Sequence, residues 1–258
     1  MMWPIISLLA SLSAMMAQAK DESHRLPRGR FLVDVEEAQR PPHNIIDAAF
    51  VTFVTNVPYV PGVEALVQSL DETGSATPLI IMTPSPVSTE LADALERIVS
   101  CSKGRRFQAQ VVNVPQLANP YSSHQARYGG SIMSKLYLFS ERIAARRVIY
   151  LDCDMLVLQP IEHLMADVQR GSLSAAPDCG ISCYTSRPNT GVIGTMPDGE
   201  TMTNLLHALT SGMASYDGAD QGFLTTYFVN ERRQGGWLPI SSKYNRLKRR
   251  CVAPAAGS

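Results

Sequence analysis

The chain lacks an excess of charge of either sign. Its 23 lysines and arginines balance 23 aspartates and glutamates over 258 residues, so the composition gives no sign of a nucleic-acid or anionic-membrane partner. Internal repeats and long low-complexity tracts are also absent. With 45% hydrophobic and 18% charged residues, the sequence indicates a globular protein of one large α/β domain, or at most two small ones.

The apolar run at the start is short for a membrane span. Trp3 to Met16 is uncharged, but a span needs about 20 residues, and the run lacks a preceding basic region. Ala17-Gln18-Ala19 has the form of a signal-peptidase site. We expect residues 1–19 to be a cleaved secretory signal, with an uncleaved Golgi-type anchor as the alternative. Either leads to the ER or Golgi lumen, or to secretion. Residues 20–47 are polar and are predicted to be a linker.

Cysteine is scarce, and no C-x-x-C pair occurs among the five, so a cysteine zinc site is not indicated. An odd number in an oxidising compartment leaves at least one free thiol or an intermolecular bridge. Cys179 and Cys183 flank a loop and are candidates to pair. Cys153 is predicted to be a core residue.

A strand ending in two carboxylates organises the rest of the chain. Residues 148–151 are Val-Ile-Tyr-Leu, and Asp152-Cys153-Asp154 follows. Because strand side chains alternate, the two aspartates point to the same side. Two short carboxylates suit Mn²⁺ or Mg²⁺, which are usually held together with substrate phosphates. A D-x-D also occurs by chance in turns and helix caps, which is the alternative interpretation.

Strands and helices alternate before this motif. Strands are predicted over residues 48–55, 78–83 and 107–114, and helices over residues 63–70, 88–98 and 132–143. Such spacing favours an α/β fold with a mostly parallel sheet flanked by helices, in which ligands bind beyond the carboxyl ends of the strands. Thr55, Asn56 and Tyr59 follow the first strand. They are therefore expected to meet Asp152 and Asp154 in one crevice.

Five blocks in order resemble the family 8 glycosyltransferases, the glycogenin-like group. The resemblance covers about residues 48–245 and implies a Rossmann-like fold of the GT-A type with a smaller C-terminal acceptor-side region. The blocks are Phe50-Val51-Thr52 through Tyr59-Val60-Pro61-Gly62, Ser134-Lys135-Leu136, Tyr150 to Asp154, Ala175-Ala176-Pro177-Asp178 through Asn189-Thr190-Gly191, and Asp217 to Leu224 with Leu238-Pro239 and Tyr244-Asn245.

The resemblance also implies roles in a retaining transfer from a UDP-sugar to a glycan or other hydroxyl acceptor. It places Mn²⁺ or Mg²⁺ on Asp152 and Asp154, with Asp220 and Gln221 at the reacting face, where Asp220 is either the nucleophile or a group that orients the acceptor. The resemblance assigns six further positions to the donor nucleotide and sugar, which are Thr55, Asn56, Tyr59, Lys135, Asp178 and Asn189. It also counts Lys135 as catalytic. From the residues alone, Lys135 also fits a solvated lysine, Tyr59 ordinary turn packing and Asp220 a helix N-cap.

The basic, small-residue stretch 246–258 departs from the family pattern. The family has a further histidine metal ligand and a glycine- and lysine-containing run, but no histidine follows Asn245 here. The resemblance therefore also admits a fragment or a catalytically impaired paralogue that binds sugar nucleotides. A homodimer is a further expectation.

Overall fold

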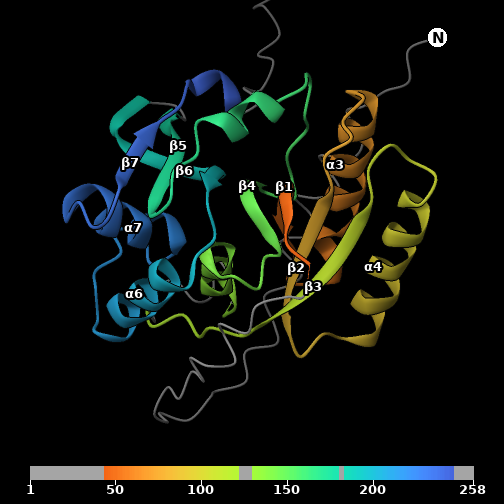
Figure 1. Cartoon of the computed structure of the whole chain (residues 1–258). Coiled ribbons are helices and arrows are strands. Elements are labelled where there is room, and N and C mark those ends of the chain that lie inside the picture. Colours follow the sequence, from red (N-terminus) through yellow and green to blue (C-terminus); the bar gives the residue numbers. More distant parts are fainter. Residues whose placement is uncertain (1–43, 122–129, 180–182, 247–258) are drawn as a thin grey trace, which may run out of the picture.

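The computed structural model describes residues 44–121, 130–179 and 183–246 (Figure 1). Expectations for residues 1–43 and 247–258, including the signal and the basic tail, lie outside this range. Within it the strands form a seven-stranded sheet of order β3-β2-β1-β4-β6-β5-β7. Their bounds are β1 Ile46–Phe53, β2 Leu79–Ser85, β3 Ala109–Pro115, β4 Ala145–Leu151, β5 Ser172–Cys179, β6 Cys183–Thr195 and β7 Gly236–Pro239.

The sheet is mostly parallel, as the sequence predicts. Strands β1 to β4 are parallel to one another where they pair, and β1 lies between β2 and β4 with Val51 opposite both Ile80 and Tyr150. The long strand β6 runs antiparallel to β4 and β5, and β7 pairs in parallel with β5 at the edge. The β4 residues Val148, Ile149 and Tyr150 are buried, as expected of a strand covered on both faces.

Helices cover both faces of the sheet. In Figure 1 α3 and α4 lie beside β1 to β3, while α6 and α7 lie toward the β7 side. Ser88 caps α4 by accepting a hydrogen bond from the Leu91 N–H, and Asp198 caps α6 in the same way. The helical bounds are η1 Val57–Tyr59, α3 Val60–Glu72, α4 Thr89–Ser102, η3 Ile132–Phe139, η4 Glu162–Ala166, α6 Gly199–Thr210, α7 Asp220–Thr225, η5 Thr226–Asn230 and η6 Ser242–Tyr244.

Two apolar cores lie on opposite faces of the sheet. One joins β1 and β4 to η3, α6 and α7 and includes Val51, Tyr150 and Phe223. The other joins the same strands to α3, α4 and η4 and includes Phe50 and Leu151. Alternate residues of each strand therefore serve different cores, which holds the sheet in register.

Two sequence expectations need correction. The 20–47 linker ends too late, because Ile46 already belongs to β1 and its N–H donates to the Ala144 carbonyl. The helix expected over residues 132–143 is a 3₁₀ helix that ends at Phe139. Its residues 133–139 are all buried, so it has no polar face of the kind an amphipathic helix presents. From Asp220 the chain forms α7 and then a π-helical turn, η5. Among the described residues, no helix is long and apolar enough to cross a membrane.

Candidate active site

The site lies between β1 and β4, where the chain stops adding strands on one side of β1 and continues on the other side. From β1 the chain moves outward through β2 and β3, and then returns to the other side of β1 as β4. Because β1 and β4 pair in parallel, their carboxyl ends lie side by side, at the edge where open α/β sheets bind ligands. Thr55, Asn56 and Tyr59 follow β1, and the two aspartates follow β4. The predicted meeting of two strand ends is confirmed.

Asp152 and Asp154 occupy a turn directly after β4. The Asp152 N–H donates to the Gly191 carbonyl at 2.9 Å, and the Asp152 carbonyl accepts from the Met155 N–H at 3.2 Å. Cys153 between them is buried, as the sequence predicts, and it has a free thiol. Burial, and after it the negative charge of Asp152, raises the pKa of Asp154.

This electrostatic arrangement fits a hard divalent cation. A cation between the two carboxylates would relieve their repulsion, and carboxylate oxygens are the ligands that such ions prefer. The Asp152 side chain is about two-fifths exposed, so its carboxylate can be reached from solvent. Within the described ranges, no three histidine, cysteine, aspartate or glutamate side chains converge as metal ligands. Water and phosphate oxygens would then supply the remaining positions.

Lys135 is buried beneath the carboxylates and is not a solvated lysine. It comes from η3, and its ammonium is only 4% exposed. Nζ lies 3.1 Å from Asp152 Oδ1, 3.0 Å from Asp220 Oδ2 and 2.8 Å from the Thr190 carbonyl oxygen. Burial alone would lower the pKa of Lys135, but the charges of Asp152 and Asp220 outweigh it and raise the pKa. The lysine therefore stays charged and joins the D-x-D motif to Asp220.

Asp220 is held from two sides by hydrogen bonds. It is the first residue of α7, and Ala219 before it is the N-cap, so the N-cap alternative is wrong. Its Oδ2 accepts from Lys135 and from the Thr190 hydroxyl at 2.9 Å. Gln221 continues the network, because its Oε1 accepts from the Thr190 N–H at 3.1 Å. These contacts fix the carboxylate and the amide at neighbouring positions.

Asp178 and Asn189 extend the same network away from the metal motif. Asn189 Nδ2 donates to Asp178 Oδ1 at 3.0 Å, and Gln221 Nε2 lies 3.3 Å from Asp178 Oδ2. Asn189 Oδ1 accepts from the Gly191 N–H and from Asn245 Nδ2 at 2.6 Å. The structure thus brings six predicted positions into one connected network, which are Lys135, Asp152, Asp178, Asn189, Asp220 and Gln221.

The residues after β1 lie beside the D-x-D turn. Asn56 is the exposed N-cap of η1, and Thr55 is half-buried. Burial raises the pKa of Tyr59, and the charges of Cys153, Asp154 and Asp152 add to this increase. Tyr59 also packs against the core on the α3 face, so turn packing and a place at the crevice are compatible.

Several groups of the network are not predicted as site residues from the sequence. The Tyr150 hydroxyl donates to Asp152 Oδ1 at 2.7 Å, and the Lys135 ammonium lies 4.4 Å from the Tyr150 ring centroid. Thr190 contacts three site residues through its hydroxyl, N–H and carbonyl. Tyr216 accepts from Gln221 Nε2 at 2.8 Å. Thr190 lies within a recognised block, but the periodicity of hydrophobic residues carries no signal for Tyr216.

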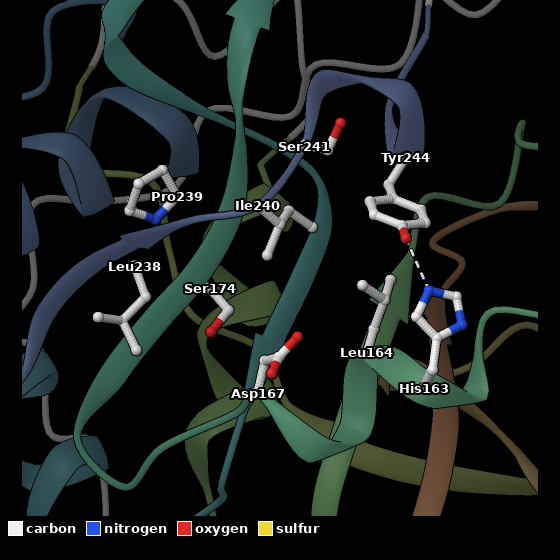
Figure 2. Close-up of a pocket in the computed structure, with 9 residues that line it drawn as sticks. All are labelled: His163, Leu164, Asp167, Ser174, Leu238, Pro239, Ile240, Ser241 and Tyr244. Atoms are coloured by element: carbon white, nitrogen blue, oxygen red, sulfur yellow. Dashed lines mark hydrogen bonds between the residues drawn. The ribbon is translucent and has the colours of Figure 1, made fainter.

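A separate pocket adjoins the network on one flank. Figure 2 shows His163 of η4 facing the hydroxyl of Tyr244, 2.7 Å from its Nε2. The pocket has a volume of about 280 Å³ and mixes apolar side chains such as Leu238 and Ile240 with polar ones. Tyr244 precedes Asn245, which binds Asn189, so the pocket wall and the site are joined by consecutive residues.

Comparison with known proteins identifies related sequences. No family model matches the chain. Glycogenin-1 of Mus musculus is 34% identical over 187 residues, which are 70% of this chain and 51% of the relative. Inositol phosphorylceramide glucuronosyltransferase 1 of Arabidopsis thaliana is 28% identical over 180 residues, which are 70% of this chain and 30% of the relative. The chain thus spans about half or less of the length of these relatives.

Solved structures share the fold. The galactosyltransferase LgtC, solved with donor and acceptor sugar analogues, matches 76% of this chain and 74% of its own with a TM-score of 0.52 and 17% identity. The glycosyltransferase GlyE of Streptococcus pneumoniae TIGR4 matches 77% of this chain and 46% of its own with a TM-score of 0.53 and 14% identity. Sequence and fold together place the chain in the glycogenin-like family 8 of glycosyltransferases.

Proposed function

We propose that the chain transfers a sugar from a UDP-sugar to a hydroxyl of a glycan or other acceptor, with retention of anomeric configuration. The observation that carries this proposal is the buried Lys135 ammonium, which contacts both Asp152 and Asp220. The two carboxylates serve separate tasks at the same crevice. The family relationship supplies the class of reaction.

Asp152 and Asp154 are assigned to a divalent metal, Mn²⁺ or Mg²⁺, on the donor diphosphate. When bound, the metal would offset negative charge that develops on the departing UDP. Lys135 fixes Asp152 Oδ1 from below, together with the Tyr150 hydroxyl. The carboxylate is therefore oriented before the donor arrives, which is the kind of support that metal ligands require.

Asp220 and Gln221 are assigned to the reacting face. Two routes remain for Asp220: attack on the anomeric carbon as UDP leaves, or orientation of an acceptor hydroxyl that attacks from the face of the departing diphosphate. In both routes the position of its carboxylate matters, and the contacts from Lys135 and Thr190 hold Oδ2 in place. Lys135 positions both carboxylates, because its ammonium contacts Asp152 Oδ1 and Asp220 Oδ2 and is itself held by the Thr190 carbonyl oxygen.

Asp178 and Asn189 are assigned to hydroxyls of the donor sugar. They hydrogen-bond to each other and meet Gln221, so a sugar bound there lies next to the reacting face. Thr55, Asn56 and Tyr59 are assigned to the uridine, on the other side of the D-x-D turn. The order nucleoside, metal, sugar and acceptor then follows the crevice from β1 toward α7.

A catalytically impaired binder of sugar nucleotides is the second candidate. Such a protein would bind the uridine and the metal ion but would not transfer the sugar. The intact connection from Asp152 through Lys135 to Asp220 and Gln221 favours the enzyme, since a binder alone has no need of an ordered carboxylate at the reacting face.

UDP release from a panel of UDP-sugars, with Mn²⁺ or with a chelator, tests the assignment. We expect release that depends on the metal and falls at least a hundredfold in Asp152→Asn and Asp220→Asn, on the order of one lost electrostatic contact to a transition state. Asp93→Asn, an exposed position on α4, is the matched control and should keep wild-type turnover. Equal turnover in all four proteins would sink the metal and carboxylate assignments.

We also propose that the protein works in an oxidising lumen. Cys179 is disulfide-bonded, and its neighbour across β5 and β6 in the backbone register is Cys183. Disulfides persist in the secretory pathway and are rare in the cytosol. N-terminal sequencing of the lumenal protein should begin near Lys20. Recovery of intact Met1 from a cytosolic pool would reject this proposal.

A further inference from the structure

Tyr216 presents an aromatic ring at the acceptor side of the site. The residue is 44% exposed, although its hydroxyl end reaches inward and accepts a hydrogen bond from Gln221 Nε2 at 2.8 Å. The Arg187 guanidinium carbon lies 4.6 Å from the ring centroid. Gln221 in turn contacts Asp178 and the Thr190 N–H. An exposed ring is therefore connected by one side chain to the reacting residues.

The loop that carries Tyr216 is fixed against the start of α7. Asp217 Oδ1 accepts from the backbone N–H groups of Ala219 and Gly222, each at 2.9 Å, and from the Ser215 hydroxyl. A Cβ at Gly222 would overlap Asp217 Oδ1 and would lie 2.6 Å from the Tyr216 nitrogen. Glycine at this position lets the loop approach the helix closely, and the ring has little freedom to move away.

The same loop is also held from the segment after β3. Asn119 Nδ2 donates to the Gly218 carbonyl at 2.9 Å, and the Tyr121 hydroxyl donates to the Met213 carbonyl at 2.5 Å. A ring that is already held in place loses little conformational entropy when a ligand stacks on it. This is the property expected of a recognition surface and is not needed in a surface side chain without a ligand.

We propose that Tyr216 is an acceptor-binding residue whose exposed ring stacks on a pyranose ring of a saccharide acceptor while its hydroxyl holds Gln221. This inference rests on the proposed function and narrows its acceptor to a saccharide. A pyranose ring has an apolar face of C–H groups and a rim of hydroxyls. Tyrosine combines an apolar ring with a polar tip, which suits such a ligand.

The protonation state of Tyr216 agrees with this arrangement. Burial of the hydroxyl end raises the pKa of Tyr216, the hydrogen bond from Gln221 opposes the increase, and the charge of Asp217 adds to it. The side chain is a neutral phenol throughout the physiological range. Its oxygen then accepts from Gln221 without adding a negative charge beside Asp178.

Two variants separate the ring from the hydroxyl. Tyr216→Ala removes both, and Tyr216→Phe removes only the hydroxyl. The control is Val111→Ala, an exposed apolar position on β3. Saturation-transfer difference NMR measures binding of methyl α- and β-glycosides of glucose, galactose and mannose in the presence of UDP and Mn²⁺. Initial rates with the same glycosides give kcat and KM separately, and UDP titration checks the donor side.

We expect at least one glycoside to bind the wild type, with an affinity about tenfold weaker in Tyr216→Ala, on the scale of one aromatic contact. UDP affinity should be unchanged. Tyr216→Phe should retain glycoside binding and acceptor KM but lower kcat, because Gln221 Nε2 loses one of its two acceptors and keeps only Asp178. Glycoside binding that is equal in wild type and Tyr216→Ala, or absent from the wild type, would overturn the inference. Sugar transfer by the wild type is measured in a separate assay, so a failure of the proposed function can be distinguished from a failure of this inference.

Discussion

Lys135 is the residue around which the polar groups of the site are arranged. Its charge is buried, and it is retained because two carboxylates and a carbonyl surround it. The sequence identifies this lysine only through a family block, because a lysine within an apolar segment otherwise fits a solvated position. Its contacts come from residues 17 to 85 positions away, and no local pattern reveals them.

Substitution of Lys135 by methionine should therefore be strongly destabilising. It leaves the buried Asp220 charge without its cation, and such losses cost about 3–5 kcal/mol. Urea unfolding measures the change, and the double variant Lys135→Met/Asp220→Asn should cost less than the sum of the two single variants. Arg105→Ala is the control, since its ion pair with Asp71 is partly exposed and is expected to contribute about 1 kcal/mol or less. Additive costs would contradict the coupling of the two site residues.

At the scale of elements, the first turn of α3 packs directly on the D-x-D turn. A Cβ at Gly62 would lie only 2.5 Å from the Cys153 carbonyl oxygen. Strands β1, β2 and β4 are well predicted because their apolar runs are buried on both faces. The 3₁₀ conformation of η3 is not predicted, since a completely buried segment lacks the alternation of polar and apolar residues from which helix type is inferred. The close approach of α3 likewise depends on tertiary packing.

Gly62→Ala should push α3 away from the D-x-D turn. We expect a loss of about 1–3 kcal/mol in the free energy of unfolding, as for other overpacked contacts, and weaker binding of UDP with Mn²⁺. Gly104→Ala is a matched control, because nothing lies within 4 Å of its added Cβ, and its effect should stay within about 0.5 kcal/mol. Equal stability of the two variants in urea would show that the contact does not constrain α3.

The loop before α7 gives a prediction about alkaline pH. Burial and the charge of Asp217 raise the pKa of Tyr121 from 10.0 to about 12, so between these values the folded state binds more protons than the unfolded state. Stability that comes from the neutral Tyr121 is complete below pH 10 and is lost as the pH rises to about 12. Tyr121→Phe lacks this dependence. Its stability deficit, about 1 kcal/mol at pH 8 from the lost hydrogen bond, should shrink toward pH 12. A constant deficit in unfolding experiments would contradict this assignment.

At the scale of the whole molecule, the position of β4 next to β1 creates the site. The sequence predicts a mostly parallel sheet and two strand ends in one crevice, because alternating strands and helices favour this topology. It does not predict that β6 runs antiparallel beside β4, which places Gly191 opposite Asp152 and brings Thr190 and Asn189 close to the site. Strand pairing over such distances is set by the packing of both cores. Asp178, Asn189 and Gln221 are therefore found only through the family blocks, and their mutual contacts become apparent only in the fold.

Calorimetric titration of UDP into the protein, with Mn²⁺ or with EDTA, tests the central claim most directly, since it needs no acceptor. We expect binding that depends on Mn²⁺ and weakens at least tenfold in Asp152→Asn and Asp154→Asn, with Asp93→Asn unchanged. A tenfold change corresponds to about 1.4 kcal/mol, less than a direct metal ligand is expected to contribute. UDP affinity that is the same in EDTA, or the same in the D-x-D variants as in the wild type, would contradict a metal-bound diphosphate at the carboxyl ends of β1 and β4.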